Sequence, residues 1–193
     1  VEALKTAVVN WRRGRHDGGI GGREYLYGDA ALHAWMRDLH DFDAVPDESR
    51  EAFFKLNRWN YQSLKDARSA AAAFLKAHAS LLDGDAREAL QRATKLYEEE
   101  LQRFEVLERS RQKPWSAESP DQWTADMRNK EREALSEARW HEDRAIAQIE
   151  KALAAEGVDV SAVAAAVGGT TPSEATASKT AGPQKELKDY RWK

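Results

Sequence analysis

The sequence of 193 residues contains no cysteine. Without thiols the chain can form no disulfide, no thiolate metal site and no cysteine nucleophile of its own. The absence is compatible with a reducing compartment, so we expect a cytoplasmic protein.

Long apolar runs and an excess of one charge are also missing. No run approaches the ~20 apolar residues of a membrane span, and the beginning of the chain does not resemble a signal peptide. Thirty Lys and Arg residues stand against 33 Asp and Glu residues, giving a net charge of -3. Interleaved charges create no basic field for nucleic acid. We therefore expect a soluble protein with no membrane or nucleic-acid partner.

Glycine is scarce except in one loop, residues 14–24, where glycines occupy positions 18, 19, 21 and 22. Each glycine loses much backbone entropy on ordering, so we expect this loop to be mobile or to be held by something outside it. Neighbouring arginines suggest a phosphate cradle, but the lysine pattern and preceding strand of such a cradle are missing. A solvated loop is the better interpretation.

The apolar pattern predicts an all-α, antiparallel up-and-down helical bundle. Long helices are predicted at residues 50–82, 86–111 and 120–155, with two shorter ones ahead of them. The joints between the long helices are short, so neighbours must run antiparallel. Residues 1–157 would form the bundle, closed by Gly157, and residues 158–193 a low-complexity, mostly disordered tail.

Two of the long helices carry one clear apolar stripe each. The stripe of 86–111 is Ala86, Leu90, Ala93, Tyr97, Leu101, Phe104 and Leu107. The stripe of 120–155 is Trp123, Met127, Ala134, Ala138, Ala145, Ile149 and Leu153. For the start of this last helix, Ser119 is predicted as N-cap, Pro120 as first residue and Gln122 as partner in a capping box.

Residues 50–82 show a seam with alternating steps of four and three, typical of packed helices. Its members are Phe53, Asn57, Asn60, Leu64, Ala67, Ala71, Phe74, His78 and Leu81. We expect this seam to face the core. Buried amides must be paired, so Asn57 and Asn60 either fix the register by hydrogen bonds or form a polar patch beneath a pocket. The first interpretation is favoured.

Five histidines are candidate metal ligands. His33 and His40 share a helix face with Arg37, opposite the apolar stripe, and an arginine between two ligands repels a cation. No Glu-x-x-His pair of the ferritin-like kind occurs. His78 and His141, together with Glu100, leave a metal-dependent bundle enzyme as an alternative. We nevertheless predict no catalytic residue, metal or cofactor.

Tryptophan is abundant, with seven residues. Trp11, Trp35 and Trp123 fall on predicted core stripes. The others lie beside seams or outside helices. Tryptophans in excess of the core suggest a surface that another domain or subunit covers.

One stretch carries a family resemblance. Residues 27–39 fit the pattern Gly-x-x-Ala-x-x-x-Trp-x-x-x-Leu, and residues 60–75, residues 97–100 and the charged helix to Leu153 follow it at matching distances. The chain thus resembles, over about residues 4–153, the helical region of proteins related to the butirosin-biosynthesis acyltransferase. Those proteins have a papain-like cysteine-peptidase fold.

The resemblance implies that the catalytic cysteine and histidine belong to a peptidase-like part. This chain has no cysteine and no residue that matches those positions, so no catalytic residue is carried over. We expect the catalytic part upstream of Val1, with the glycine loop, Tyr25 and Tyr27 lining or covering its cleft. The alternative is a lineage that kept only the helices as a binding protein.

The sequence therefore predicts a non-catalytic helical accessory or pocket domain of a cysteine-peptidase-like or acyltransferase-like protein. Its partner would be the missing upstream domain or another protein. A stand-alone bundle for protein–protein interaction or self-association is the main alternative. The candidate pocket or interface residues are Tyr25, Tyr27, Trp35, Asn57, Asn60, Tyr61 and His78.

Overall fold

A computed structural model describes residues 1–16, 25–110 and 116–159. Over these residues the fold is all-α, as predicted. The helices are α1 (Glu2–Arg13), α2 (Gly28–His40), α3 (Asp47–Ala79), α4 (Gly84–Arg109) and α5 (Ala125–Ala155). Two 3-10 helices, η2 (Asp41–Ala44) and η4 (Pro120–Gln122), precede α3 and α5. Two short strands, β1 (Arg15–His16) and β2 (Tyr25–Leu26), pair antiparallel.

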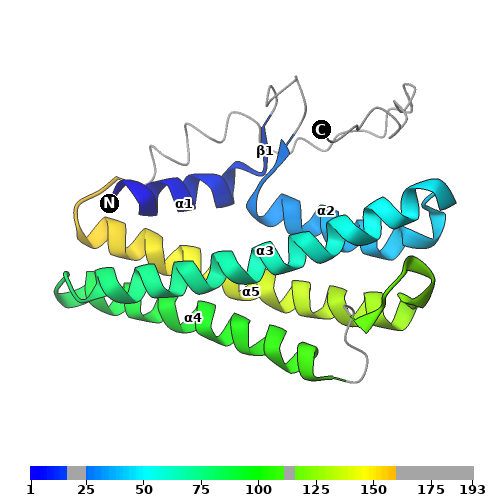
Figure 1. The fold of residues 1–193 in the computed structure, drawn as a ribbon. Helices are drawn as coiled ribbons and strands as arrows, with labels where there is room; N and C mark the ends of the chain where they lie inside the picture. The colour runs from blue at the N-terminus through cyan, green and yellow to red at the C-terminus, as the bar shows by residue number, and fades with distance from the viewer. Residues whose placement is uncertain (17–24, 111–115, 160–193) are drawn as a thin grey trace, which may run out of the picture.

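The three long helices lie side by side with alternating direction (Figure 1). Between α3 and α4, Lys65 meets Glu108 and Arg68 meets Glu100, so residue numbers rise along one helix and fall along the other. Helices α1 and α2 both pack on α5 and follow one another along it in Figure 1. Together they occupy the place of a fourth helix.

The junction between α1 and α2 depends on a glycine. Gly28 has a φ of 52°, a conformation that costs other residues strain. A Cβ at this position would lie 2.4 Å from the carbonyl oxygen of Trp11. The indole of Trp11 in turn donates to Asp143 of α5 over 3.2 Å. Only glycine lets α2 begin this close to the end of α1.

An aromatic cluster fills one end of the core. Trp123 is 1% exposed and contacts Phe42 edge-on, with ring centroids 4.9 Å apart. Phe53 and Phe54 of α3 complete the cluster. Trp123 and Trp11 are thus confirmed as core residues. On α4 and α5 the predicted stripes are buried, apart from the half-buried Leu101 and Met127.

The predicted start of α5 is wrong. Ser119 precedes the separate 3-10 turn η4, and Gln122 belongs to that turn. Trp123, with a ψ of 78°, interrupts the helix where its indole enters the core. Helix α5 then begins with Thr124 as N-cap, whose hydroxyl accepts a hydrogen bond from the Met127 amide over 3.3 Å.

The predicted seam of α3 is also wrong in its second half. Phe74 is 37% exposed and Leu81 is 76% exposed, whereas Leu75 is only 2% exposed. The buried residues of α3 are Phe54, Asn57, Tyr61, Ala72, Leu75 and Ala79. Apolar residues occupy two faces of this helix, so their spacing alone does not identify the face that meets the core.

Two other predictions fall largely outside the described residues. The expected mobility of the glycine loop concerns mainly residues 17–24, and the expected tail concerns residues 160–193. The loop prediction did not include the strand pair that flanks it. Gly157, with a φ of 72°, follows the end of α5 as predicted. In the described part of the chain, no helix is long and apolar enough to cross a bilayer.

Candidate functional site

Three ionisable side chains meet inside the bundle, one from each long helix. Arg68 of α3 forms an ion pair with Glu142 of α5, and its Nε lies 3.7 Å from Oε1 of Glu100 of α4. The two glutamates are 2% and 0% exposed. The guanidinium also lies 5.7 Å from the ring centre of Tyr97. This charged layer, Arg68, Glu100 and Glu142, ties α3, α4 and α5 together at one level.

A second polar group lies nearer the aromatic end. The indole of Trp35 on α2 donates to Oδ1 of Asn57 over 2.6 Å. The amide of Asn57 donates to Oε1 of Glu131 on α5 over 2.8 Å. We call Trp35, Asn57 and Glu131 the amide layer; it joins α2, α3 and α5. Asn57 thus makes the interhelical hydrogen bonds expected from its place in the predicted seam.

Two of the buried carboxyl groups, Glu100 and Glu131, are poor acids. Burial raises the pKa of Glu131 to about 8, although the hydrogen bond from Asn57 lowers it. Burial likewise raises the pKa of Glu100 to about 8 against the attraction of Arg68. Both groups therefore hold their proton at neutral pH, which avoids the cost of a buried charge.

These carboxyl groups have no access to a substrate. A group with a pKa near 8 can act as a general acid, but it must come within hydrogen-bond reach of the reacting atom. Glu100 and Glu131 are both 0% exposed. They line neither the groove between α3 and α4 nor the one between α4 and α5. We therefore assign both layers to structure.

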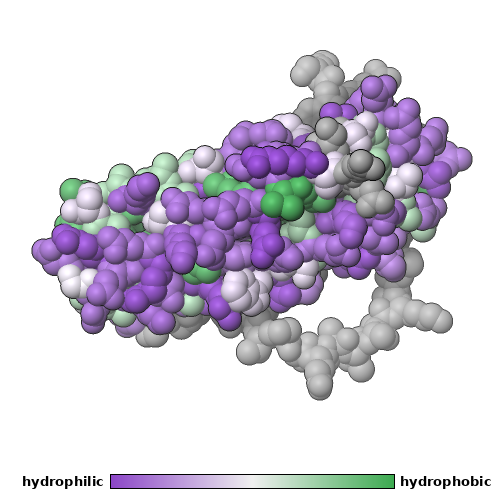
Figure 2. All heavy atoms as spheres, turned by 90° about the horizontal axis from the view of Figure 1, so that it is seen from below, coloured by the Kyte–Doolittle hydropathy of each residue, from purple (hydrophilic) through white to green (hydrophobic). Residues whose placement is uncertain are grey.

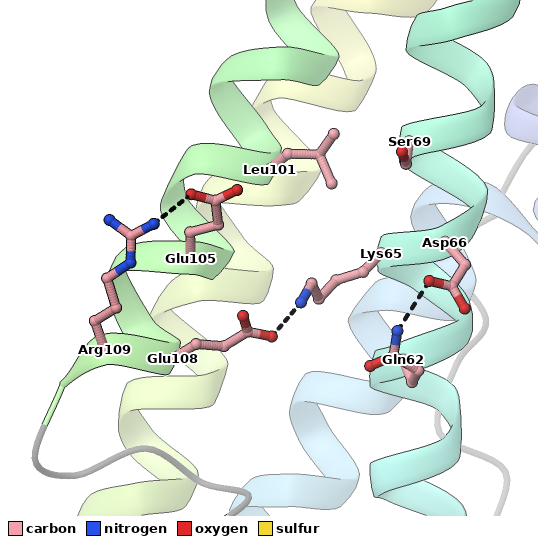
Figure 3. Close-up of a pocket in the computed structure, with 8 residues that line it drawn as sticks. All are labelled: Gln62, Lys65, Asp66, Ser69, Leu101, Glu105, Glu108 and Arg109. Carbon is pink, nitrogen blue, oxygen red and sulfur yellow. Dashed lines mark hydrogen bonds and ion pairs between the residues drawn. The ribbon is translucent and has the colours of Figure 1, made fainter.

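The groove between α3 and α4 has a volume of about 450 Å³ (Figure 3). Figure 3 shows its charged side chains directed at partners instead of into open space. Lys65 pairs across the groove with Glu108, while Glu105 pairs with Arg109 and Asp66 with Gln62 along their own helices. Four of the five charges in this groove are already in ion pairs, so the groove offers a ligand only the carboxylate of Asp66, which accepts a hydrogen bond from a neutral amide.

The outer face of α3 is a surface of a different kind. Uncharged residues recur along it at steps of three or four: Ala52, Leu56, Trp59, Ser63, Ala67, Ala70, Phe74 and Ala77. We call this set the α3 stripe. All of its members are exposed except the half-buried Ser63. Leu56 and Trp59 are 54% and 67% exposed, and Leu81 extends the stripe into the following turn.

The α3 stripe stands out in this molecule. Charged residues make up 33% of the chain. Along the central turns of the stripe, however, the nearest charged residue is Asp66, at one edge. Four of the nine large apolar side chains that the described residues leave exposed lie on α3 or in the turn after it. The underside of the molecule, where α4 lies, is by contrast mainly hydrophilic (Figure 2).

The seven candidate residues do not form one pocket. Trp35, Asn57 and Tyr61 lie at the same end of the bundle, with Tyr61 buried against Phe104. Asn60 is half-buried on α3. The remaining three lie elsewhere: Tyr25 and Tyr27 at the α1–α2 junction, and His78 near the end of α3, with its Nδ1 2.9 Å from the carbonyl oxygen of Phe74.

Two of the described histidines lie near one carboxylate each: His33 near Asp29, and His141 near Glu99. His141 lies 3.8 Å from Glu99, and burial lowers its pKa. His33 and His40 are exposed on the outer face of α2. Among the residues that the structure describes, no group of three or more His, Asp or Glu is placed to hold a metal ion.

Sequence reasoning missed the interior role of the four ionisable residues in the two layers. Arg68 and Glu131 were assigned no role, Glu142 was considered only beside His141 as one end of a possible site, and Glu100 only as a metal ligand. The spacing of one of these residues relative to apolar neighbours did indicate burial. Glu100 falls three residues after Tyr97 and four before Phe104, on the apolar stripe of α4.

No protein-family model, curated protein or solved structure matches the chain. The resemblance to the helical region of the acyltransferase-related proteins stays a prediction.

Proposed function

We propose that this chain is a non-catalytic helical docking domain whose α3 stripe binds an apolar surface of another polypeptide. The exposure of Leu56 and Trp59 within an uncharged stripe carries the proposal. Contiguous exposed apolar surface of this kind marks interaction sites, and tryptophan is enriched among the residues that dominate binding energy.

The buried layers support this role by making α3 a fixed platform. The charged layer holds the middle of α3 against α4 and α5. The amide layer holds its first half against α2 and α5. A surface that is already ordered loses little conformational entropy when it binds.

Two kinds of partner fit this proposal. As an accessory domain of a cysteine-peptidase-like or acyltransferase-like protein, the chain would contact a catalytic part that supplies the cysteine it lacks. As a stand-alone bundle, it would associate with a second copy or another protein. We place either form in the cytoplasm, since a chain without cysteine has no need of an oxidising compartment.

In-cell photo-crosslinking tests the proposal. A photoreactive residue replaces Ala70 on the α3 stripe in one variant and Gln91, exposed on α4, in a matched control. We expect a discrete adduct from position 70, with mass spectrometry locating the cross-link on an apolar protein surface, and little adduct from position 91. Equal cross-linking from both positions, or none from position 70, would contradict a docking role for α3.

A further inference from the structure

The order of side-chain sizes along the α3 stripe is nearly the same in both directions. Leu56 and Trp59 form a bulky end, and Phe74 forms the other. The middle contains only small side chains: Ser63, Ala67 and Ala70. Small residues allow the backbone of a second helix to come close, so the stripe has a low centre between two raised ends.

We infer that the α3 stripe pairs with the α3 stripe of a second copy, antiparallel, with the two helices crossing at residues 63–70. This inference rests on the proposed function and names its partner. A two-fold dimer brings the same patch of each copy together, so the patch must complement itself. In the antiparallel arrangement the small centres meet, and the Leu56–Trp59 end of each copy covers the opposite half of its partner's stripe.

Charge favours the same partner. The carboxylate of Asp66 at the stripe's edge already accepts a hydrogen bond from Gln62 over 2.9 Å. Asp66 keeps its negative charge and is the nearest charge over the central turns. A strongly charged partner would therefore gain at most this one ion pair while losing hydration over the rest of the surface. A second copy of the stripe brings an equally uncharged surface.

The size of the stripe points to a reversible contact. From Ala52 to Ala77 it extends over 25 residues, or about 38 Å, and a helix is roughly 10 Å wide, so each copy buries on the order of 400 Å². Stable complexes bury about 800 Å² per partner, and permanent interfaces bury more. The stripe alone is thus too small for a permanent interface with a catalytic domain and fits a weak dimer that depends on concentration.

Pulsed electron–electron resonance between spin labels tests the orientation of the pair. The chain has no cysteine, so one introduced cysteine carries the only label. Lys55→Cys and Ala73→Cys place labels on exposed positions beside the stripe. With a crossing near residue 67, two copies labelled at position 55 lie about 36 Å apart along the helix axis, and two labelled at position 73 about 18 Å apart.

We expect the long distance from position 55 and the short one from position 73, at protein concentrations that populate the dimer. Adding Ala70→Glu should abolish both distances, and adding the control Gln91→Glu should leave them unchanged. Short distances from both positions would show a parallel pair and overturn the inference.

No intermolecular distance, together with a protein that sediments as a monomer, would also overturn it. In that case an adduct between position 70 and a different protein would leave the proposed docking function standing. Absence of both the distances and the adduct would defeat the two proposals together.

Discussion

Helices α3 and α4 are neighbours whose inner faces are similar, whereas their outer faces differ in charge. Inside, each contributes one ionisable residue, Arg68 and Glu100, to the same buried layer. Outside, α4 carries ion pairs along its length, such as Glu88 with Arg92. The outer face of α3 carries the uncharged α3 stripe instead. The difference shows that the apolar content of a helix does not by itself identify the face that builds the core.

This difference also separates stability from interaction. Helix α3 already buries a complete inner face, with Leu75 and Tyr61 2% and 3% exposed. Apolar residues on its outer face add little to the core, and exposed apolar surface brings a risk of aggregation. A contact made by the outer face of α3 would explain why apolar residues are exposed there. The charged outer face of α4 needs no such explanation.

The largest effect is expected from breaking the charged layer. Arg68→Met leaves Glu142 buried without its cation, which should lower the free energy of unfolding by about 3–5 kcal/mol. Arg92→Met on the outer face of α4 removes only an exposed pair and should cost less than about 1 kcal/mol. Urea unfolding of both variants at pH 7 measures the contrast. Similar losses in the two variants would contradict the assignment of Arg68 to a buried layer.

Two adjacent residues on α3 sharpen the contrast between its faces. Leu75→Ala removes a side chain that is 2% exposed and should cost about 2–5 kcal/mol. Phe74→Ala removes one that is 37% exposed and should cost the monomer roughly 1 kcal/mol or less. The measurement is denaturant unfolding at low protein concentration. A greater loss for Phe74→Ala would restore the seam predicted from the sequence.

An effect that depends on pH is expected from the amide layer on the inner side of α3. The pKa of Glu131 is about 8 in the folded protein against an ordinary value of 4.5. The folded state thus binds more protons between these values. The stability contributed by protonated Glu131 is fully present below pH 4.5 and is lost as the pH rises to about 8.

Glu131→Gln keeps the shape and the acceptor for Asn57 but removes this titration. Relative to the variant, the wild type should lose stability with rising pH, with a slope of at most about 1.4 kcal/mol per pH unit. Urea unfolding of both proteins at several pH values between 5 and 9 measures it. Parallel curves for the two proteins would show that Glu131 titrates normally.

The fold class and most of the core could be predicted from the sequence because α4 and α5 each have one apolar face. The stripe from Leu90 to Leu107 on α4 is buried almost as predicted. Helix α3 misled the prediction because two apolar faces fit the same spacing. The true face is decided by contacts across the bundle, such as those of Asn57 with Trp35 and Glu131.

The start of α5 and the polar layers were missed for a different reason. Ser119 and Pro120 form a genuine turn signal, but the burial of Trp123 ends that turn before the helix begins. Glu100 and Glu142 stand in runs of charged residues, where a local pattern indicates a solvated face. Their burial follows from meeting Arg68, a residue distant in the sequence. The α3 stripe could not be distinguished from a core face in the sequence, because only the structure shows that it points outward.

We propose that the outer face of α3 binds a partner while its inner face stabilises the bundle. Sedimentation velocity over a wide concentration range, on wild type, Ala70→Glu and the α4 control Gln91→Glu, tests this most directly. We predict that wild type and Gln91→Glu sediment faster as concentration rises, that Ala70→Glu stays monomeric, and that all three unfold within about 0.5 kcal/mol of each other. An Ala70→Glu protein that associates like wild type would contradict this binding role, and a wild type that is monomeric throughout would contradict pairing with a second copy.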